Sequence, residues 1–221
     1  MRLMAREVAG SSPRSGLRPG LRAGALSLLL AWGCSGISGG SSAPPSPGEF
    51  SGSVPDLRGS RVLVLPVQSV EGFPPGTGSP AADAELAFAL GERGPAVEWV
   101  LPDEIRRVLA RSPGVQVTPD ALPVGPFLRG SVQRVGDPLF GDLIRLSALT
   151  STQVALIPVR VRSGQDAVDG TWRVEILGTF LDVRSGRVLW TGVVDGRGGT
   201  GLSFEGELLV AADSFARTVV R

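Results

Sequence analysis

A short apolar stretch near the N-terminus determines which part of this chain can fold. It runs from Ala23 to Trp32, about ten residues, whereas an apolar helix needs roughly 20 residues to cross a bilayer. Five arginines precede it, and they are Arg2, Arg6, Arg14, Arg18 and Arg22. A basic start, a short apolar core and small residues are typical of an export signal that is removed from the mature protein. We therefore predict that residues 1–33 are a signal peptide and take no part in the fold.

The predicted signal ends just before Cys34, the single cysteine of the chain. The apolar run with Gly33 and Cys34 resembles a bacterial lipoprotein signal, whose cleavage leaves the cysteine first and acylated. That resemblance implies a palmitate-type anchor on Cys34. Because Ser35 follows, and not aspartate, it also implies the periplasmic face of the outer membrane. Ala31-Trp32-Gly33 fits ordinary signal cleavage without lipid as well, so both processing routes stay open.

Residues 34–58 are predicted to form a flexible tether. They contain Gly-Gly-Ser-Ser and Ala-Pro-Pro-Ser-Pro and few apolar side chains. Such a segment buries too little surface to offset the entropy of ordering it. Residues 59–221 have an ordinary globular composition, and a chain of this size buries about 70% of its unfolded surface. We predict a single α/β domain over this range.

The composition argues against several classes of function. Residues 1–33 hold five of the 22 basic and one of the 21 acidic residues, so the rest has a formal net charge of −3. Nucleic-acid-binding proteins carry a basic surface, and this negative net charge argues against that class. The chain has no histidine and no lysine, which excludes a Ser-His-Asp triad, a histidine metal site, a P-loop lysine and a Schiff base. We therefore expect no cofactor, no metal and no enzymatic activity.

The apolar pattern predicts alternating strands and helices. The run from Arg61 to Val67 is continuously apolar, as in strands covered on both faces. Ser79-Pro80, Pro102 and Asp137-Pro138 have the residues that begin helices. Further strands are predicted over 97–100, 154–159, 171–183 and 187–194, with a possible strand through 115–117 and a last helix from about residue 205. This order predicts an α/β fold with a mixed β-sheet flanked by helices, in a two- or three-layer sandwich.

Three local features are predicted within the later strands. Pro158 indicates a sheet edge or a bulge, because proline lacks the donor for a ladder hydrogen bond. The strand over 171–183 is expected to be interrupted at Gly178. A three-residue turn over 184–186 would place Phe180 opposite Trp190, which is a favourable aromatic pair.

Three segments resemble the CsgG and TolB-amino-terminal group of bacterial envelope proteins. They are the Arg61–Val67 strand, the passage from Leu149 to Pro158, and the hairpin from Leu181 to Trp190 with its Asp-x-x-x-Gly-x-hydrophobic form. The resemblance covers about residues 59–220. It implies a non-enzymatic domain, often on a lipoprotein, that builds or regulates an envelope machine such as the secretion pore for curli-type fibres. Pore-forming members need extra long hairpins, and no such inserted pair is evident in the sequence.

Two glycine motifs have simpler interpretations than catalysis. Gly196–Gly201 matches G-x-G-x-x-G, but no parallel strand is predicted after it, so a connector is favoured over a dinucleotide site. Gly36–Gly40 matches G-x-S-x-G inside the predicted tether, away from any strand-to-helix elbow.

Two carboxylate pairs leave one enzymatic alternative open. Asp166 with Asp169, or Glu205 with Glu207, would serve a carboxylate-based hydrolase of wall or sugar polymers if the two groups faced each other across a cleft. Solvated charges in a loop and at a helix start are the plainer interpretation.

The leading hypothesis is a lipid-anchored, non-catalytic envelope protein that binds or scaffolds another envelope component. An oligomeric curli-type secretion subunit is the alternative within the same class, and the oligomeric state is left open. Phe73, in the Gly72–Gly76 loop, either folds against the core or contacts a partner. Exposed apolar groups rimmed by polar residues would favour partner binding over hydrolysis.

Overall fold

The computed structural model describes residues 50–196, 198–199 and 201–220. The strands within them are β1 (Phe50–Gly52), β2 (Arg61–Val64), β3 (Val70–Glu71), β4 (Glu98–Val100), β5 (Val154–Gln165), β6 (Trp172–Asp182) and β7 (Arg187–Asp195). The helices are α1 (Ser79–Arg93), α2 (Pro102–Ala110), α3 (Gly125–Arg129), α4 (Leu139–Thr150) and α5 (Phe204–Val219). None of these helices has both the length and the apolar character needed to cross a membrane. Cys34, the predicted signal over residues 1–33 and the Gly36–Gly40 motif lie outside the described residues.

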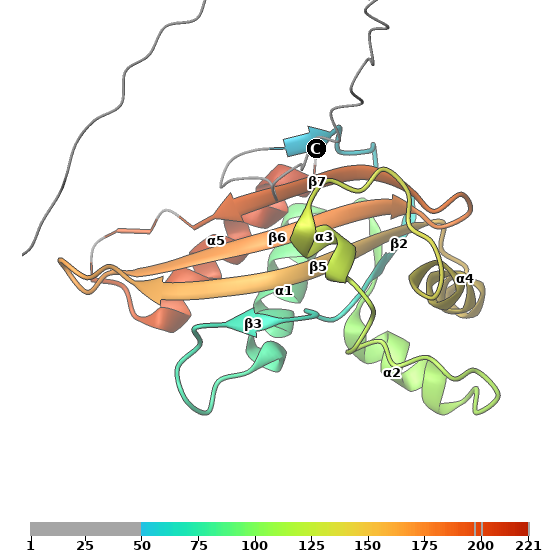
Figure 1. The fold of residues 1–221 in the computed structure, drawn as a ribbon, viewed down its shortest axis with the longest axis horizontal. Coiled ribbons are helices and arrows are strands. Elements are labelled where there is room, and N and C mark those ends of the chain that lie inside the picture. The colour runs from blue at the N-terminus through green and yellow to red at the C-terminus, as the bar shows by residue number, and fades with distance from the viewer. Residues whose placement is uncertain (1–49, 197, 200, 221) are drawn as a thin grey trace, which may run out of the picture. The chain divides into compact units, whose positions relative to one another are not determined.

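The strands form one mixed sheet in the order β1-β7-β6-β5-β2-β4, and β3 pairs with β5 beside this row (Figure 1). β2 is parallel to β4 and to β5. The chain therefore needs crossover connections early on, and the first helices supply them. β5, β6 and β7 are antiparallel neighbours. The prediction of a mixed sheet with early helices and late antiparallel pairing is confirmed.

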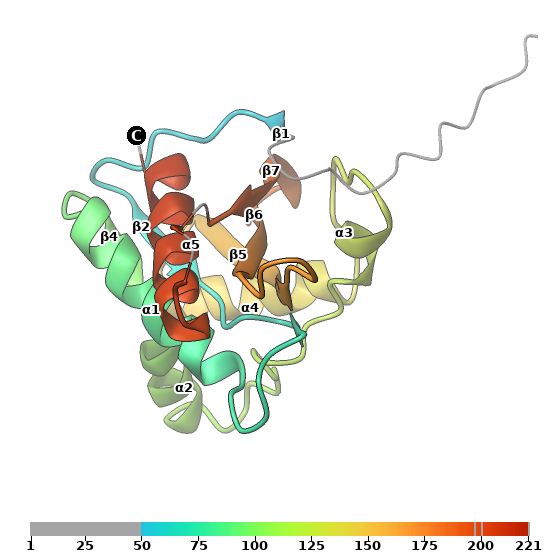
Figure 2. The ribbon, with the colours of Figure 1, turned by 90° about the vertical axis from the view of Figure 1, so that its left-hand side faces the viewer.

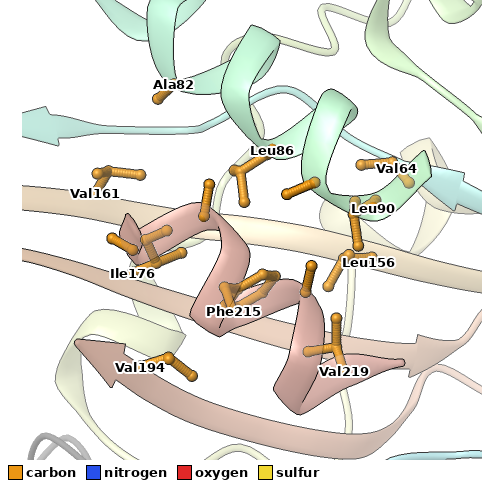
Figure 3. Close-up of a cluster of buried hydrophobic side chains, with 14 of the residues drawn as sticks. Val64, Ala82, Leu86, Leu90, Leu156, Val161, Ile176, Val194, Phe215 and Val219 are labelled. Atoms are coloured by element: carbon orange, nitrogen blue, oxygen red, sulfur yellow. The ribbon is translucent and has the colours of Figure 1, made fainter. Parts of the chain in front are cut away.

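Helices α1 and α5 lie side by side against one face of the sheet (Figure 2). Leu86 and Leu90 are one turn apart on α1, and Phe215 and Val219 are one turn apart on α5. These side chains point into a core between the helices and the sheet, where they meet strand residues such as Leu156 (Figure 3). Each helix thus presents an apolar stripe to the sheet, as the helical spacing predicts.

A second core lies on the opposite face of the sheet. Ile105 of α2, Phe127 of α3 and Leu143 of α4 contribute to it, together with Leu63 and Ile157 from the sheet. Successive residues of a strand point to opposite faces, so β2 and β5 serve both cores. This explains why their sequences are continuously apolar. The fold is a three-layer α/β sandwich.

The β6–β7 hairpin places Phe180 opposite Trp190, as predicted, with ring centroids 6.0 Å apart. The turn differs from the prediction because residues 183–186, four residues and not three, lie between the strands. The register shifts between Phe180 and Leu181, where Leu189 is the extra residue on β7. This bulge restores the pairing that the longer turn would otherwise displace.

Two other local predictions have different outcomes. The register of β5 and β6 shifts between Pro158 and Arg160, which confirms a bulge at the proline. The expected interruption at Gly178 is wrong, because β6 continues from Trp172 to Asp182. The strand has a glycine at this position because α5 packs directly over it, and a side chain there would collide with Phe215.

The sheet starts earlier than the sequence indicates, since β1 lies within the range predicted as tether. Phe50 pairs with Gly192 of β7, and its ring stacks on Trp190 with centroids 6.0 Å apart. A Cβ built on Gly192 would collide with the Phe50 ring, so the glycine makes room for this contact. Leu57, also within that range, is buried. One aromatic contact from far along the chain holds β1, and local composition does not reveal such a contact.

The segment between α2 and α4 was the least clear from sequence. The possible strand over 115–117 is not formed; these residues are part of a loop that leads to Leu122 and to α3. Gln68 holds this loop, because its Oε1 accepts from Leu122 N at 2.7 Å and its Nε2 donates to Pro119 O at 2.9 Å. Side-chain bonds from a distant residue replace the backbone ladder that a strand would have used.

Candidate partner-binding site

Phe73 packs against its own domain. Its ring lies edge-on to Phe204 at the start of α5, with centroids 4.8 Å apart, and Trp172 approaches the same Phe204 ring at 5.4 Å. Phe73 remains partly exposed. The aromatic group closes one end of the α5 core, and a contact with a partner stays a prediction.

Asp166 and Asp169 hold the loop between β5 and β6. Asp166 Oδ1 accepts from Val168 N at 2.9 Å, and Asp169 Oδ1 accepts from Thr171 N at 2.9 Å. The backbone hydrogen bond from Thr171 lowers the pKa of Asp169. A carboxylate of low pKa that caps a turn serves the loop geometry and is poorly suited to act as a general acid.

Glu205 and Glu207 have opposite environments although two residues separate them. Glu205 is exposed, and hydrogen bonding to the backbone at its own position and to Ser203 lowers its pKa. Glu207 is 2% exposed, and burial raises its pKa. Its Oε1 accepts from Gly198 N at 3.4 Å, and its Oε2 has no hydrogen-bond partner in the described part of the chain. The two carboxylates therefore do not face each other across a cleft.

Within the Gly196–Gly201 motif, Gly198 lies directly against this buried carboxylate. A Cβ built on Gly198 would collide with Glu207 Oε2, so glycine allows the backbone to approach closely. Arg197 and Thr200 lie outside the described residues. Among the described residues no group of three or more cysteine, aspartate or glutamate side chains is arranged to hold a metal ion.

The most distinctive surface feature is a pair of large apolar side chains on neighbouring helices. Phe88 on α1 is 65% exposed, and Leu209 on α5 is 48% exposed. Both line an open groove of about 370 Å³ between the two helices. We call this the α1–α5 groove and define it by Glu85, Phe88, Ala89, Glu92, Arg93, Leu209 and Asp213.

Helical spacing explains how the groove is built. Glu85, Phe88 and Glu92 follow one another at three and four residues, so they form one stripe along α1. Leu209 and Asp213 are four residues apart and form the facing stripe on α5. The groove has depth because the small, buried Ala89 lies between the stripes and leaves the space that a larger side chain would fill.

Charges frame the apolar centre of the groove unevenly. Arg93 Nε contacts Asp213 Oδ1 at 2.7 Å and so joins α1 to α5, while Arg217 pairs with the other oxygen of Asp213. The hydrogen bond from Arg93 lowers the pKa of Asp213. Glu85 and Glu92 form no salt bridge within the described residues. The α1 side of the groove therefore presents two carboxylates without salt bridges, one turn to either side of Phe88, and Glu92 lies in the field of Arg93.

A second cavity, about 420 Å³, lies between α1 and α2 beside Trp99. Its charged residues hold the fold together. Asp83 Oδ1 accepts from Val67 N at 2.7 Å, and its Oδ2 contacts Arg106 at 3.4 Å. Arg106 also contacts Asp120 at 2.6 Å. Because this network joins the segment after β2 to α1, α2 and the loop that holds Asp120, we assign it a structural role.

One residue in the sequence points to the groove, although the helical spacing of the core residues does not reveal it. Phe88 falls about 200° around α1 from both Leu86 and Leu90, on the face expected to be polar. A large apolar residue on that face does not contribute to the core, so its presence indicates another role. Leu209 is next to the buried Leu208, and only the position of α1 shows that it faces solvent beside Phe88.

Comparisons with known proteins add structural neighbours of low sequence identity. No protein-family model and no curated protein matches the chain. Similar solved structures include the PelC dodecamer from Paraburkholderia phytofirmans, with 14% identity, 78% of this chain and 97% of that chain covered, and a TM-score of 0.45. The lipoprotein GNA1162 from Neisseria meningitidis has 16% identity, 72% and 97% coverage, and a TM-score of 0.43.

The LpoB C-terminal domain from Salmonella enterica is similar over 65% of this chain and 86% of that chain, with 14% identity and a TM-score of 0.41. All three TM-scores are below 0.5. The functional proposal therefore rests on the residues and geometry of this chain itself, and the resemblance to the CsgG and TolB-amino-terminal group stays a prediction.

Proposed function

We propose that this protein is a lipid-anchored, non-catalytic component of a bacterial cell envelope that binds another envelope protein through the α1–α5 groove. The observation that supports the proposal best is the exposure of Phe88 and Leu209 around one hollow with a charged rim. Apolar groups gathered in this way, in place of single scattered ones, are characteristic of interaction sites.

The energetics of such a site are sufficient for a specific contact. Burying one large apolar side chain contributes about 1.5–3 kcal/mol. Phe88 and Leu209 both lie on helices that are packed on the sheet, so little conformational entropy is lost when a partner covers them. A central aromatic anchor surrounded by polar groups is the usual arrangement of residues that dominate a binding energy.

The anchor explains why such a modest groove would be effective. Acylation at Cys34 would confine the domain to the membrane surface. A random coil of about 15 residues, the number between Cys34 and the first strand, would reach roughly 20 Å. Confinement within that distance raises the local concentration of any partner in the same membrane. We place this site at the periplasmic face of the outer membrane, from the residue that follows the cysteine.

The hydrolase alternative has little support in the geometry. Asp169 caps a turn, and Glu205 and Glu207 differ in exposure, so neither candidate pair has the arrangement of two carboxyl groups across a cleft. Binding is therefore favoured over hydrolysis.

A photo-cross-linking experiment tests the groove in cells. A benzophenone amino acid replaces Phe88, Leu209 or, as a control, Ile144, which is also exposed and apolar but lies on α4. We expect the same cross-linked protein from positions 88 and 209 and a much weaker product from 144. Equal products from all three positions, or different products from 88 and 209, would contradict the proposal.

A second experiment tests the anchor separately. Cys34→Ser should abolish incorporation of labelled palmitate and release the protein from sedimented membranes. If the substituted protein is processed and still sediments with the membranes, the lipid anchor at this residue is wrong, whatever the cross-linking shows.

A further inference from the structure

Two arginines lie opposite each other where the segment between α3 and α4 meets the start of β7. Arg134 and Arg187 form an antiparallel bridge. Val135 N donates to Gly186 O at 2.8 Å on one side of it, and Val188 N donates to Gln133 O at 2.9 Å on the other. The two arginines are therefore a non-hydrogen-bonded pair, in which Cα atoms are about 4.5 Å apart and the side chains share one face.

This arrangement places like charges directly opposite each other, which destabilises a sheet. Arg134 and Arg187 are both exposed, and so is Arg184 in the adjacent turn. None of the three guanidinium groups forms a hydrogen bond or a salt bridge within the described part of the chain. These three arginines therefore have no ion-pair partner among the described residues, while Asp182 lies opposite Arg187 in the β6–β7 register.

Nearby carboxylates are used for other contacts. Asp182 Oδ1 accepts from Ser185 N at 2.9 Å and shapes the turn. Asp137 Oδ1 accepts from Gly141 N at 3.1 Å at the start of α4. Most other arginines of the domain do have carboxylate partners, such as Arg93 with Asp213 and Arg162 with Glu175. Arg58 and Arg111 also lack a salt bridge within the described residues, so what distinguishes Arg134 and Arg187 is that they lie directly opposite each other.

We propose that Arg134 and Arg187, assisted by Arg184, bind a phosphate group. A guanidinium is planar and presents a fixed fork of donors that matches the oxygens of a phosphate. Two such forks on one face, carried by neighbouring backbones, have the donors to bind one tetrahedral anion. Binding replaces the repulsion between the arginines with two charge-assisted contacts.

The surroundings also indicate what else the ligand carries. Arg134 lines a cavity of about 210 Å³ whose apolar wall includes Pro123, Pro126, Val132 and Leu139. Asp137 also lines it, and its Oδ1 accepts from Gly141 N. An apolar wall beside Arg134 suits a phosphate attached to an uncharged organic group. A phospholipid headgroup and a soluble phosphate compound share this chemistry, and the experiment separates them. The site is independent of the α1–α5 groove.

The first arm of the test uses inorganic tripolyphosphate with the chain from residue 34 onward carrying Cys34→Ser. The double variant Arg134→Gln/Arg187→Gln is compared with Arg58→Gln/Arg111→Gln, which removes two exposed arginines without salt bridges and matches the net charge. We expect at least ten-fold weaker binding for the first pair and little change for the second. Equal losses in both double variants would overturn the proposal.

The second arm uses vesicles of phosphatidylcholine with and without phosphatidylglycerol. Sedimentation with the anionic vesicles that is lost only in Arg134→Gln/Arg187→Gln identifies a lipid headgroup as the ligand. Binding of tripolyphosphate without vesicle binding identifies a soluble phosphate compound. If neither probe distinguishes this variant from its control, the site does not exist.

Stability provides a readout that does not depend on finding the ligand. Arg134→Gln alone should raise the unfolding midpoint at low ionic strength, and the gain should shrink in 0.5 M sodium chloride, because salt screens the repulsion. Phosphate stabilises any protein more than chloride does, so the comparison is between variants: the gain from phosphate should be larger for wild type than for Arg134→Gln/Arg187→Gln. A lower midpoint for Arg134→Gln at low salt would show that the arginines do not repel and would contradict the inference.

Discussion

The ring of Phe215 on α5 occupies the space that a side chain at residue 178 of β6 would need. A Cβ built on Gly178 would lie 2.5 Å from Phe215 Cζ and 2.6 Å from its Cε2. Phe215 is fully buried and also contacts Trp190 edge-on, with centroids 6.1 Å apart. The missing side chain at Gly178 thus sets how closely α5 can approach the sheet, and with it the position of the α5 side of the groove.

Gly178→Ala should lower the free energy of unfolding by about 1–3 kcal/mol, because the methyl group overpacks a rigid aromatic core. Gly164→Ala is the matched control. Gly164 lies on the neighbouring strand β5, and a Cβ built there meets nothing within 4 Å. Denaturant titrations of both variants measure the difference, and equal effects would show that the Phe215 contact is unimportant.

Asp83→Ala should cost about 1–3 kcal/mol of stability, since it leaves the buried Val67 N–H without its acceptor. Asp103→Ala serves as the comparison, because Asp103 also pairs with Arg106 but its side chain is 89% exposed, whereas that of Asp83 is 10% exposed. We expect the Asp103 change to stay within about 0.5 kcal/mol. A loss of the same size at both positions would assign the effect to Arg106 and not to the buried amide.

Glu207→Gln should stabilise the protein at neutral pH. Burial raises the pKa of Glu207 above the ordinary glutamate value of 4.5. The folded state therefore holds this proton more tightly than the unfolded state. Its stabilising contribution is complete below the unfolded pKa and is lost as the pH rises through the folded pKa.

The glutamine variant lacks this titration. The amount by which its stability exceeds that of wild type should therefore grow from pH 4 to pH 8. Unfolding midpoints across that range measure the trend. An advantage that is constant with pH would mean that Glu207 titrates normally.

Asp213→Asn should have the opposite pH dependence. The hydrogen bond and charge of Arg93, with Arg217, lower the pKa of Asp213. The stability that this carboxylate contributes is present above its unfolded pKa and is lost as the pH falls through the folded pKa. The asparagine variant should therefore be less stable than wild type at pH 7 and equal to it at acidic pH. High salt should reduce the difference at pH 7, and a difference that survives at pH 2 would point to packing instead of charge.

Much of the fold follows from residue patterns that act over short distances. The apolar run of β2, the proline-marked helix starts and the facing of Phe180 and Trp190 are all local in origin. Elements that depend on distant partners were missed. β1 needs the Trp190 ring, and the loop before α3 needs the side chain of Gln68. Gly178 was misjudged for the same reason, because its partner Phe215 comes from another element.

The candidate groove was less predictable than the fold. Its essential property is that Phe88 and Leu209 are neighbours, and this depends on how α1 and α5 pack together. Sequence alone ranks Phe73 as the aromatic group most open to a partner, because it stands in a glycine- and proline-rich loop. The structure shows that Phe73 packs on Phe204, whereas the Phe88 side chain is 65% exposed.

The three-residue strand β1 has a mechanical consequence for a domain held by its N-terminal side. Any pull from that direction acts first on the β1–β7 hydrogen bonds and the Phe50–Trp190 stacking, before it reaches β2. So short a strand detaches at much lower load than the long β5–β6–β7 ladder. Its release would add up to about 3.5 Å of extended chain for each freed residue on the N-terminal side, while both cores of the sandwich stay packed.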